Sequence, residues 1–208
     1  MHNLPFETAG LFAEDVQTLE KTYTALKEKF NVGLPCDVEL PLEKFDLFNG
    51  NPNIVAGGTL SIAHPSNNCY LAFIRIHICY NPIKSAGEPV DYYKYQVWGL
   101  IKAKKDYGRI FIRRETFADK LVGLVHPVEL EFKDDKAFSK QYYVLTNDQD
   151  RAQMAMNWNF RNAIMNIQGR DIIIETANNL MVIGDNKYLD AGETIYLTET
   201  MVKLASVS

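Results

Sequence analysis

The sequence has little cysteine. It carries Cys36, Cys69 and Cys79 in 208 residues, and an odd count at uneven spacing does not form the paired framework of a disulfide-stapled protein. We expect these thiols to be reduced, as in the cytoplasm. A chain of this length with 47% hydrophobic residues can bury a core without disulfides or metals, so we expect one domain over residues 1–208.

The sequence also lacks a long apolar run. The most apolar stretch, Cys69–Tyr80, is interrupted by Arg75 and His77 and is shorter than the roughly 20 residues that cross a bilayer. The first residues, Met1–Gly10, have neither the basic flank nor the apolar run of a signal peptide. We therefore expect a cytoplasmic protein without a transmembrane segment.

A strong net charge is absent as well. The chain has 22 basic and 26 acidic side chains and a net charge of -4, which argues against a protein that coats nucleic acid and against disorder caused by self-repulsion. An anionic partner would have to meet a local basic patch.

One segment has a clear helical pattern. Apolar residues recur at spacings of four and three, which predicts a helix over residues 11–31 that ends at Gly33 and Pro35. The apolar positions are Phe12, Val16, Leu19, Tyr23, Leu26 and Phe30. We expect this stripe to pack on the body of the chain. The alternative is self-association with a second copy through Phe12, Leu19 and Leu26.

Residues 36–114 form the strand-rich part of the sequence, because the apolar period there changes to two and is punctuated by glycine and proline. The predicted strands cover residues 37–48, 53–63, 69–80, 90–105 and 109–114. The short segment Lys105–Gly108 contains turn residues, so we expect the last two strands to form an antiparallel hairpin.

Residues 115–208 mix helices and strands. We expect a short helix near residues 115–122 and strands at 128–132 and 142–145. A long helix is predicted over 148–167, because Thr146, Asn147 and Asp148 can cap its first turn. Its apolar residues fall on two faces, one of them lined by Met154, Trp158 and Met165, so we expect it to be covered on both sides.

The C-terminal segment contains a predicted hairpin. Asparagine tolerates the positive φ of a tight turn, so Asn178 and Asn179 can join strands at 171–177 and 180–184. Residues 193–205 fit either a strand or a helix. The fold class is α+β: a mostly antiparallel sheet, an N-terminal amphipathic helix and a second long helix near the C-terminus.

Part of the chain resembles a bacterial family of uncharacterised domains. The resemblance is carried by the stretch from Phe132 to Ala152, the helix after it and the Ile172–Ile183 hairpin, and it spans Val90–Leu204. That family has an aromatic-rich strand pair, a strand of the form Val-x-Ser-x-Asp, a helix opening Ala-Arg and a final hairpin. This chain has the reverse order, Arg151–Ala152. The resemblance implies soluble cytosolic domains, often behind membrane helices, and carries no established activity.

Few residues suggest chemistry. Gly57–Gly58 lies in a strand pattern without the lysine of a phosphate loop. The segment Asp185–Asp190 brings oxygen ligands into a loop, but Lys187 and Leu189 replace the third and fifth ligands of a calcium loop and its sixth residue is not glycine. His77 and Cys79 share a strand face and are zinc-type ligands, but Cys69 on the same face is over 30 Å away at strand rise. We therefore expect no metal and no cofactor.

A basic segment is the one charge asymmetry. Six cations and a single acid, Asp106, fall between residues 102 and 114. The cations are Lys102, Lys104, Lys105, Arg109, Arg113 and Arg114. Aromatic residues lie among and before them, a mixture that binds single-stranded nucleic acid or anionic surfaces. The alternative is an edge hairpin whose lysines prevent edge-to-edge pairing.

These observations favour a non-enzymatic interaction or regulatory domain in the cytoplasm that acts on an unknown protein partner, with the basic hairpin as a contact for an anionic one. The opposing hypothesis is an enzyme whose catalytic groups come from separated elements and leave no short motif.

Overall fold

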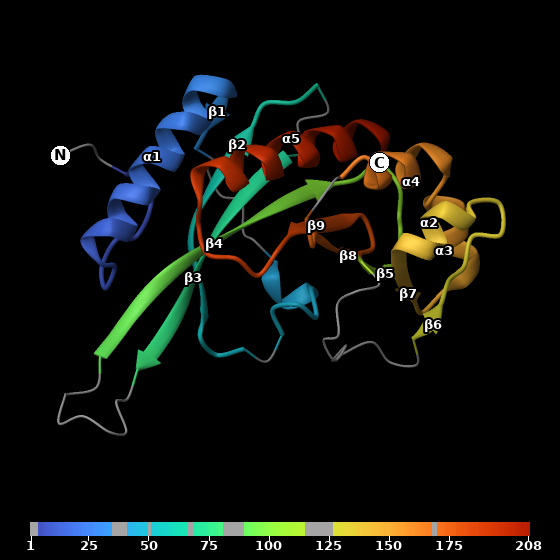
Figure 1. Cartoon of the computed structure of the whole chain (residues 1–208), viewed down its shortest axis with the longest axis horizontal. Coiled ribbons are helices and arrows are strands. Elements are labelled where there is room, and N and C mark those ends of the chain that lie inside the picture. The colour runs from blue at the N-terminus through green and yellow to red at the C-terminus, as the bar shows by residue number, and fades with distance from the viewer. Residues whose placement is uncertain are drawn as a thin grey trace.

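The structure is a computed structural model that describes residues 4–34, 41–49, 51–65, 69–80, 90–114, 127–167 and 170–208. In these residues, nine strands form one antiparallel sheet in the order β1-β2-β3-β4-β9-β8-β5-β7-β6 (Figure 1). The strands are β1 (Val32–Gly33), β2 (Ile54–Ile62), β3 (Cys69–Tyr80), β4 (Val90–Lys102), β5 (Arg109–Arg114), β6 (Val128–Glu129), β7 (Tyr142–Thr146), β8 (Ile173–Ala177) and β9 (Leu180–Gly184). The helices are α1 (Ala13–Lys29), the 3-10 helix η1 (Leu42–Lys44), α2 (Lys136–Gln141), α3 (Gln149–Ala155), α4 (Trp158–Met165) and α5 (Ala191–Val207). The predicted α+β class is confirmed.

One face of the sheet is covered by helices. Helix α5 packs on β3, β4 and β9, and α1 packs against α5 (Figure 1). Leu19 and Leu26 of α1 are fully buried in this core. Their packing on the chain's own body is therefore confirmed. Phe12 of the same stripe is 45% exposed, and self-association stays a prediction.

The opposite face is covered by the segment 41–49. Phe45 and Phe48 are buried there, and the Phe48 ring meets Trp98 edge to face at 5.2 Å. The predicted strand at 37–48 is wrong over its described part, which forms η1 and a turn; residues 37–40 lie outside the described residues. The apolar residues of this segment do not alternate between two strand faces; Phe45 and Phe48, three residues apart, both pack in the cluster on this side of the sheet.

Several predicted strands match the structure closely. The predictions at 69–80 and 109–114 coincide with β3 and β5, and β8 and β9 form the predicted hairpin. Asn178 at its turn has φ 58°, the conformation for which asparagine is suited. The short helix expected near 115–122 lies outside the described residues.

The predicted hairpin between β4 and β5 is wrong. Strand β4 pairs with β9, and β5 pairs with β8 and β7, so the β8–β9 hairpin lies between them. The intervening loop instead bonds to the tip of that hairpin: the Ala103 N–H donates to Asn179 O at 2.8 Å, and the Tyr107 N–H donates to Asn178 O at 2.9 Å. A short loop with turn residues thus bridges two strands that are not neighbours.

The predicted helix over 148–167 is divided in two. Asp148 caps α3 as expected, accepting from the Arg151 N–H at 3.1 Å, but Asn157 caps a second helix, accepting from the Phe160 N–H at 3.0 Å. Asparagine competes with the helix for backbone groups and so starts a new one. Met154 and Trp158 are exposed, which contradicts the expectation that both faces are covered.

The ambiguous segment 193–205 is helical and belongs to α5. Asp190 caps this helix, and the buried hydroxyls of Thr194, Thr198 and Thr200 donate to carbonyls one turn earlier. These bonds satisfy the polar groups that a mostly buried helix would otherwise leave unpaired. None of the helices in the described residues has the length and apolar character needed to cross a membrane.

The burial of Leu19 gives a testable prediction. Leu19→Asp places an unpaired carboxylate in the core and should lower the free energy of unfolding by more than about 3 kcal/mol. Gln17→Asp, at an exposed position of the same helix, should change it by less than about 0.5 kcal/mol. Urea unfolding followed by circular dichroism measures both, and equal stability of the two variants would contradict the packing of α1.

Candidate functional site

Strands β3 and β4 extend beyond their neighbours in the sheet. They pair over their whole length, from Cys69↔Ile101 to Tyr80↔Val90, but β2 pairs with β3 only as far as Ile76. Strand β9 pairs with β4 only over residues 98–102. The result is a two-stranded projection (Figure 1), which we call the outer arm and define as residues 77–80 and 90–93.

Three ligand-type side chains meet on the outer arm. His77 and Cys79 share one face of β3, and the strand pairing places Asp91 of β4 opposite Cys79. The Cys79 Sγ lies 3.7 Å from His77 Nε2, and that nitrogen lies 3.8 Å from Asp91 Oδ1. The three ligand atoms are all within 4.8 Å of one another. These residues can therefore converge on one small cation.

The His77 ring is held by its neighbour across the strands. It stacks on the Tyr93 ring with centroids 4.9 Å apart, and the guanidinium carbon of Arg75 lies 3.9 Å from the same ring's centroid. Arg75 in turn donates to Ala9 O. The chain passes close to Tyr93 at Gly10, where φ is +76° and a Cβ would lie 2.8 Å from the tyrosine ring. The N-terminal segment thus supports the base of the arm.

The two described cysteines have different chemical settings, and neither forms a disulfide. Burial raises the pKa of Cys69 to about 11, so this thiol is inert. The pKa of the exposed Cys79 is also raised, chiefly by its hydrogen bond with Asp91 and further by the negative charge of that carboxylate. Asp91 therefore lowers the fraction of Cys79 that is present as the reactive thiolate.

Sequence reasoning found His77 and Cys79 but missed Asp91. Cys79 and Asp91 lie twelve positions apart in the sequence. Only the pairing register of β3 and β4 sets Asp91 opposite Cys79. The predicted strands at 69–80 and 90–105 were the available signal, because two consecutive strands that pair antiparallel bring residues of both strands opposite each other. To identify Asp91 from this signal, the register had to be known to the exact residue, since a slip of one position moves a side chain to the other face.

The predicted basic site is divided by the fold. Lys104 and Lys105 are exposed in the loop after β4, and Lys102 is exposed at the end of that strand. Arg113 lies over the Tyr143 ring at 5.3 Å, and Arg114 donates to Ile167 O at 3.2 Å. The two arginines are therefore engaged by the protein itself.

Arg109 also has a structural role. It donates to Glu175 Oε1 at 3.1 Å and to Lys44 O at 2.6 Å. The buried Glu175 carboxylate accepts from the N–H groups of Asp46 and Leu47 at 2.7 and 3.0 Å. Burial raises the pKa of Glu175, while these backbone bonds and Arg109 act in the opposite direction. Arg109 and Glu175 together fasten segment 41–49 to the sheet.

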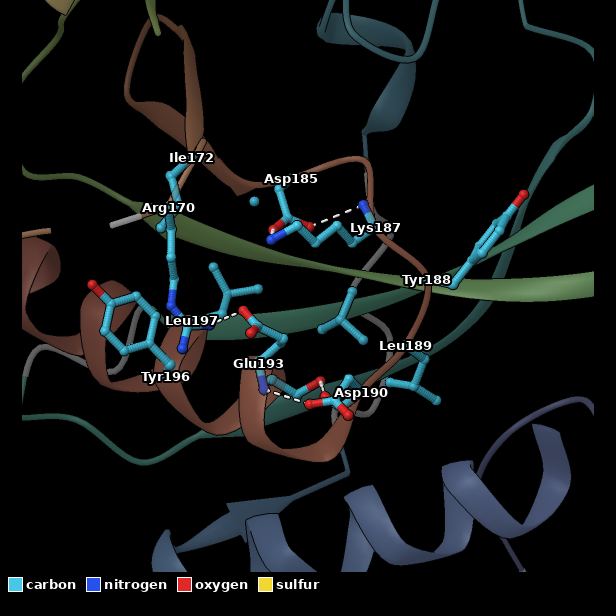
Figure 2. A pocket seen from close by; sticks show the side chains of 13 residues that line it. Arg170, Ile172, Asp185, Lys187, Tyr188, Leu189, Asp190, Glu193, Tyr196 and Leu197 are labelled. Atoms are coloured by element: carbon cyan, nitrogen blue, oxygen red, sulfur yellow. Dashed lines mark hydrogen bonds and ion pairs between the residues drawn. The ribbon is translucent and has the colours of Figure 1, made fainter. Parts of the chain in front are cut away.

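A small hollow lies at the N-terminus of α5. Figure 2 shows Arg170 directed towards Glu193, with which it forms an ion pair, and Asp190 capping the helix. The Arg170 guanidinium also lies over the Tyr196 ring at 3.9 Å. The volume of this hollow is about 30 Å³, whereas ligand pockets measure roughly 300–1,000 Å³. This hollow has room for water, and its charged groups bind one another.

Comparison with known proteins identifies a related fold. No protein-family model matches the chain, and no curated protein matches it. Among solved structures, the crystal structure of the mycobacterial trehalose monomycolate transport factor A, TtfA, is similar to it. The TM-score is 0.51 at 9% sequence identity, over 90% of this chain and 91% of that chain. The chain shares this fold. The resemblance to a family of uncharacterised bacterial domains stays a prediction.

The role of Arg109 can be tested by comparing it with Lys104. Arg109→Ala removes the cation from a buried carboxylate and should destabilise the protein by about 2 kcal/mol, whereas Lys104→Ala should cost less than about 0.5 kcal/mol. Because Arg109 favours ionised Glu175, its contribution is present above the pKa of that carboxyl and is lost as pH falls through it. The loss in Arg109→Ala should therefore shrink as pH is lowered from neutrality towards 4.5, the ordinary pKa of glutamate. Equal stability of both variants in urea titrations would contradict this assignment.

The setting of Cys79 predicts its reactivity. In the folded protein, iodoacetamide should modify Cys79 and leave Cys69 intact, because the thiolate is the nucleophile and, of the two cysteines that the structure describes, Cys79 is exposed and Cys69 is buried. Asp91→Asn should speed the reaction at neutral pH, because it removes the carboxylate whose hydrogen bond and negative charge raise the pKa of Cys79. Asp106→Asn, which alters an exposed carboxylate in the loop between β4 and β5, should leave the rate unchanged. Peptide mass spectrometry follows each thiol, and equal rates in all three proteins would refute the contact.

Proposed function

We propose that this chain is a non-enzymatic interaction domain that binds a protein partner through the outer arm. The observation that carries the proposal is the pair Tyr80 and Val90, which oppose each other at the end of the arm. Their exposed fractions are 60% and 44%. Two large apolar side chains that lie side by side and face solvent are typical of an interaction surface, and tyrosine is enriched among residues that dominate binding energy.

The backbone of the arm supports the same proposal. In the described part of the chain, no strand pairs with β4 on the side away from β3 over residues 90–97, or with β3 on the side away from β4 over residues 77–80. Loops occupy part of these edges: the Tyr93 N–H donates to Gly10 O, and the His77 N–H donates to Asn53 O. The last pairs of the ladder keep open edges of the kind to which an extended peptide adds a strand.

The compartment and the structural comparison are compatible with this role. Cys69 and Cys79 form no disulfide and Cys79 is exposed, which favours a reducing compartment such as the cytoplasm. The protein of similar fold, TtfA, is a transport factor. The comparison supports the proposal only in that the same fold occurs in a protein with a role in transport.

Photo-crosslinking tests the proposal. A photo-reactive amino acid at Tyr80, introduced into the full chain and irradiated in cells of the source organism, should give a discrete protein adduct. The same amino acid at Tyr188, which has a similar exposed fraction of 53% outside the arm, should not. Val90→Ser should reduce the Tyr80 adduct without changing the melting temperature by more than a few degrees.

Two outcomes would overturn the proposal. One is an equal pattern of adducts from Tyr80 and Tyr188. The other is a discrete adduct from Trp158 but none from Tyr80, which would move the interface to the junction of α3 and α4, where Met154 and Trp158 are exposed.

A further inference from the structure

We propose that His77, Cys79 and Asp91 form a binding site for one Zn²⁺ ion on the outer arm. This inference concerns a metal site and does not rest on the proposed protein partner. It revises the expectation from sequence that the cysteines bind no metal, because the third ligand comes from the neighbouring strand rather than from Cys69.

The distances fit a tetrahedral ion. Zinc bonds of about 2.3 Å to sulfur and about 2.0–2.1 Å to nitrogen place those two ligand atoms about 3.6 Å apart. The Cys79 Sγ and His77 Nε2 are 3.7 Å apart. The corresponding nitrogen–oxygen separation is about 3.4 Å, and His77 Nε2 lies 3.8 Å from Asp91 Oδ1. These two separations differ from the tetrahedral values by less than half an ångström, and the three ligand atoms all lie within 4.8 Å of one another, so small side-chain rotations can bring them around one ion.

The donor set selects the metal. A thiolate, an imidazole and a carboxylate are the three ligand types of protein zinc sites, whereas calcium and magnesium take oxygen ligands. A deprotonated Cys79 and Asp91 carry two negative charges, which balance Zn²⁺. Binding therefore replaces the Cys79 S–H bond with a sulfur–zinc bond and releases one proton to solvent.

The backbone holds the ligands in place. All three belong to strands: His77 and Cys79 lie two residues apart on one face, and Asp91 is the direct partner of Cys79. Tyr93 stacks on the His77 ring and limits its rotation. Because Cys79 and Asp91 are exposed, the fourth position of the ion opens to solvent and takes water, as in zinc sites with three protein ligands.

The test is a zinc titration of the chelator-treated full chain. Zn²⁺ added in competition with a chromophoric chelator should bind with a stoichiometry of one per chain. Co²⁺ in place of Zn²⁺ should give a thiolate-to-cobalt charge-transfer band and the intense visible absorption of a tetrahedral site. Bound Zn²⁺ should also protect Cys79 from alkylation.

Single variants make the assignment specific. Cys79→Ser should abolish the charge-transfer band, and His77→Ala and Asp91→Asn should each weaken Zn²⁺ binding by at least about tenfold. His64→Ala removes a histidine outside the arm and should bind as the parent does. Because the ligands lie on an exposed arm, circular dichroism spectra should be unchanged in all four.

The proposal is overturned if the parent does not bind Zn²⁺ at micromolar concentration, or if the Co²⁺ complex lacks the thiolate band. It is also overturned if folded Cys79→Ser or Asp91→Asn binds as tightly as the parent. Loss of crosslinking from Tyr80 would leave these measurements untouched, so the failure of the partner proposal and the failure of the metal site are distinguishable.

Discussion

The register between β3 and β4 is the constraint on which the candidate site depends. Twelve consecutive residue pairs join the two strands, and the inner pairs are fixed by burial, because Leu71 and Phe73 must face the helices while Ala72 and Ile74 face the opposite side. A slip by one residue would exchange the two sets between faces that are packed by different elements, and neither set would fit its new neighbours. The buried half of the ladder therefore determines which side chains meet in the exposed half, including Cys79 and Asp91.

The same constraint shows how much of the fold could be predicted from sequence. Period-two patterns located β3 and β5, because each of those strands is buried on at least one face and its side chains record the alternation. The order of the strands in the sheet could not be predicted in this way. The segment between β4 and β5 contains turn residues, yet it binds the tip of the β8–β9 hairpin through Asn178 and Asn179, residues some 70 positions later. Local turn chemistry does not record which hairpin lies between two strands.

Charge patterns in the sequence had a similar limit. Arg109, Arg113 and Arg114 are cations in any count of the basic segment, but in the fold they bind a buried carboxylate, an aromatic ring and a backbone carbonyl. Arginine is suited to such contacts because its planar group can donate several bonds and stack on rings. The lysines at 102, 104 and 105 stay at the surface. How many of these cations stay exposed therefore depends on acceptors supplied by distant segments, which composition does not show.

The proposed metal site of the outer arm and its exposed apolar pair are physically connected. A two-stranded ribbon without further neighbours is marginally stable in water, and the last pairs of β3 and β4 have no third strand beside them in the described part of the chain. An ion held by Cys79 on one strand and Asp91 on the other would link the two across the ladder, and the free energy of metal binding would stabilise the paired state of the arm. Tyr80 and Val90 form the next pair beyond these ligands. Fixing the ligand pair would thus reduce the conformational entropy that the apolar pair loses when it meets a partner, because a preordered surface binds at lower entropic cost.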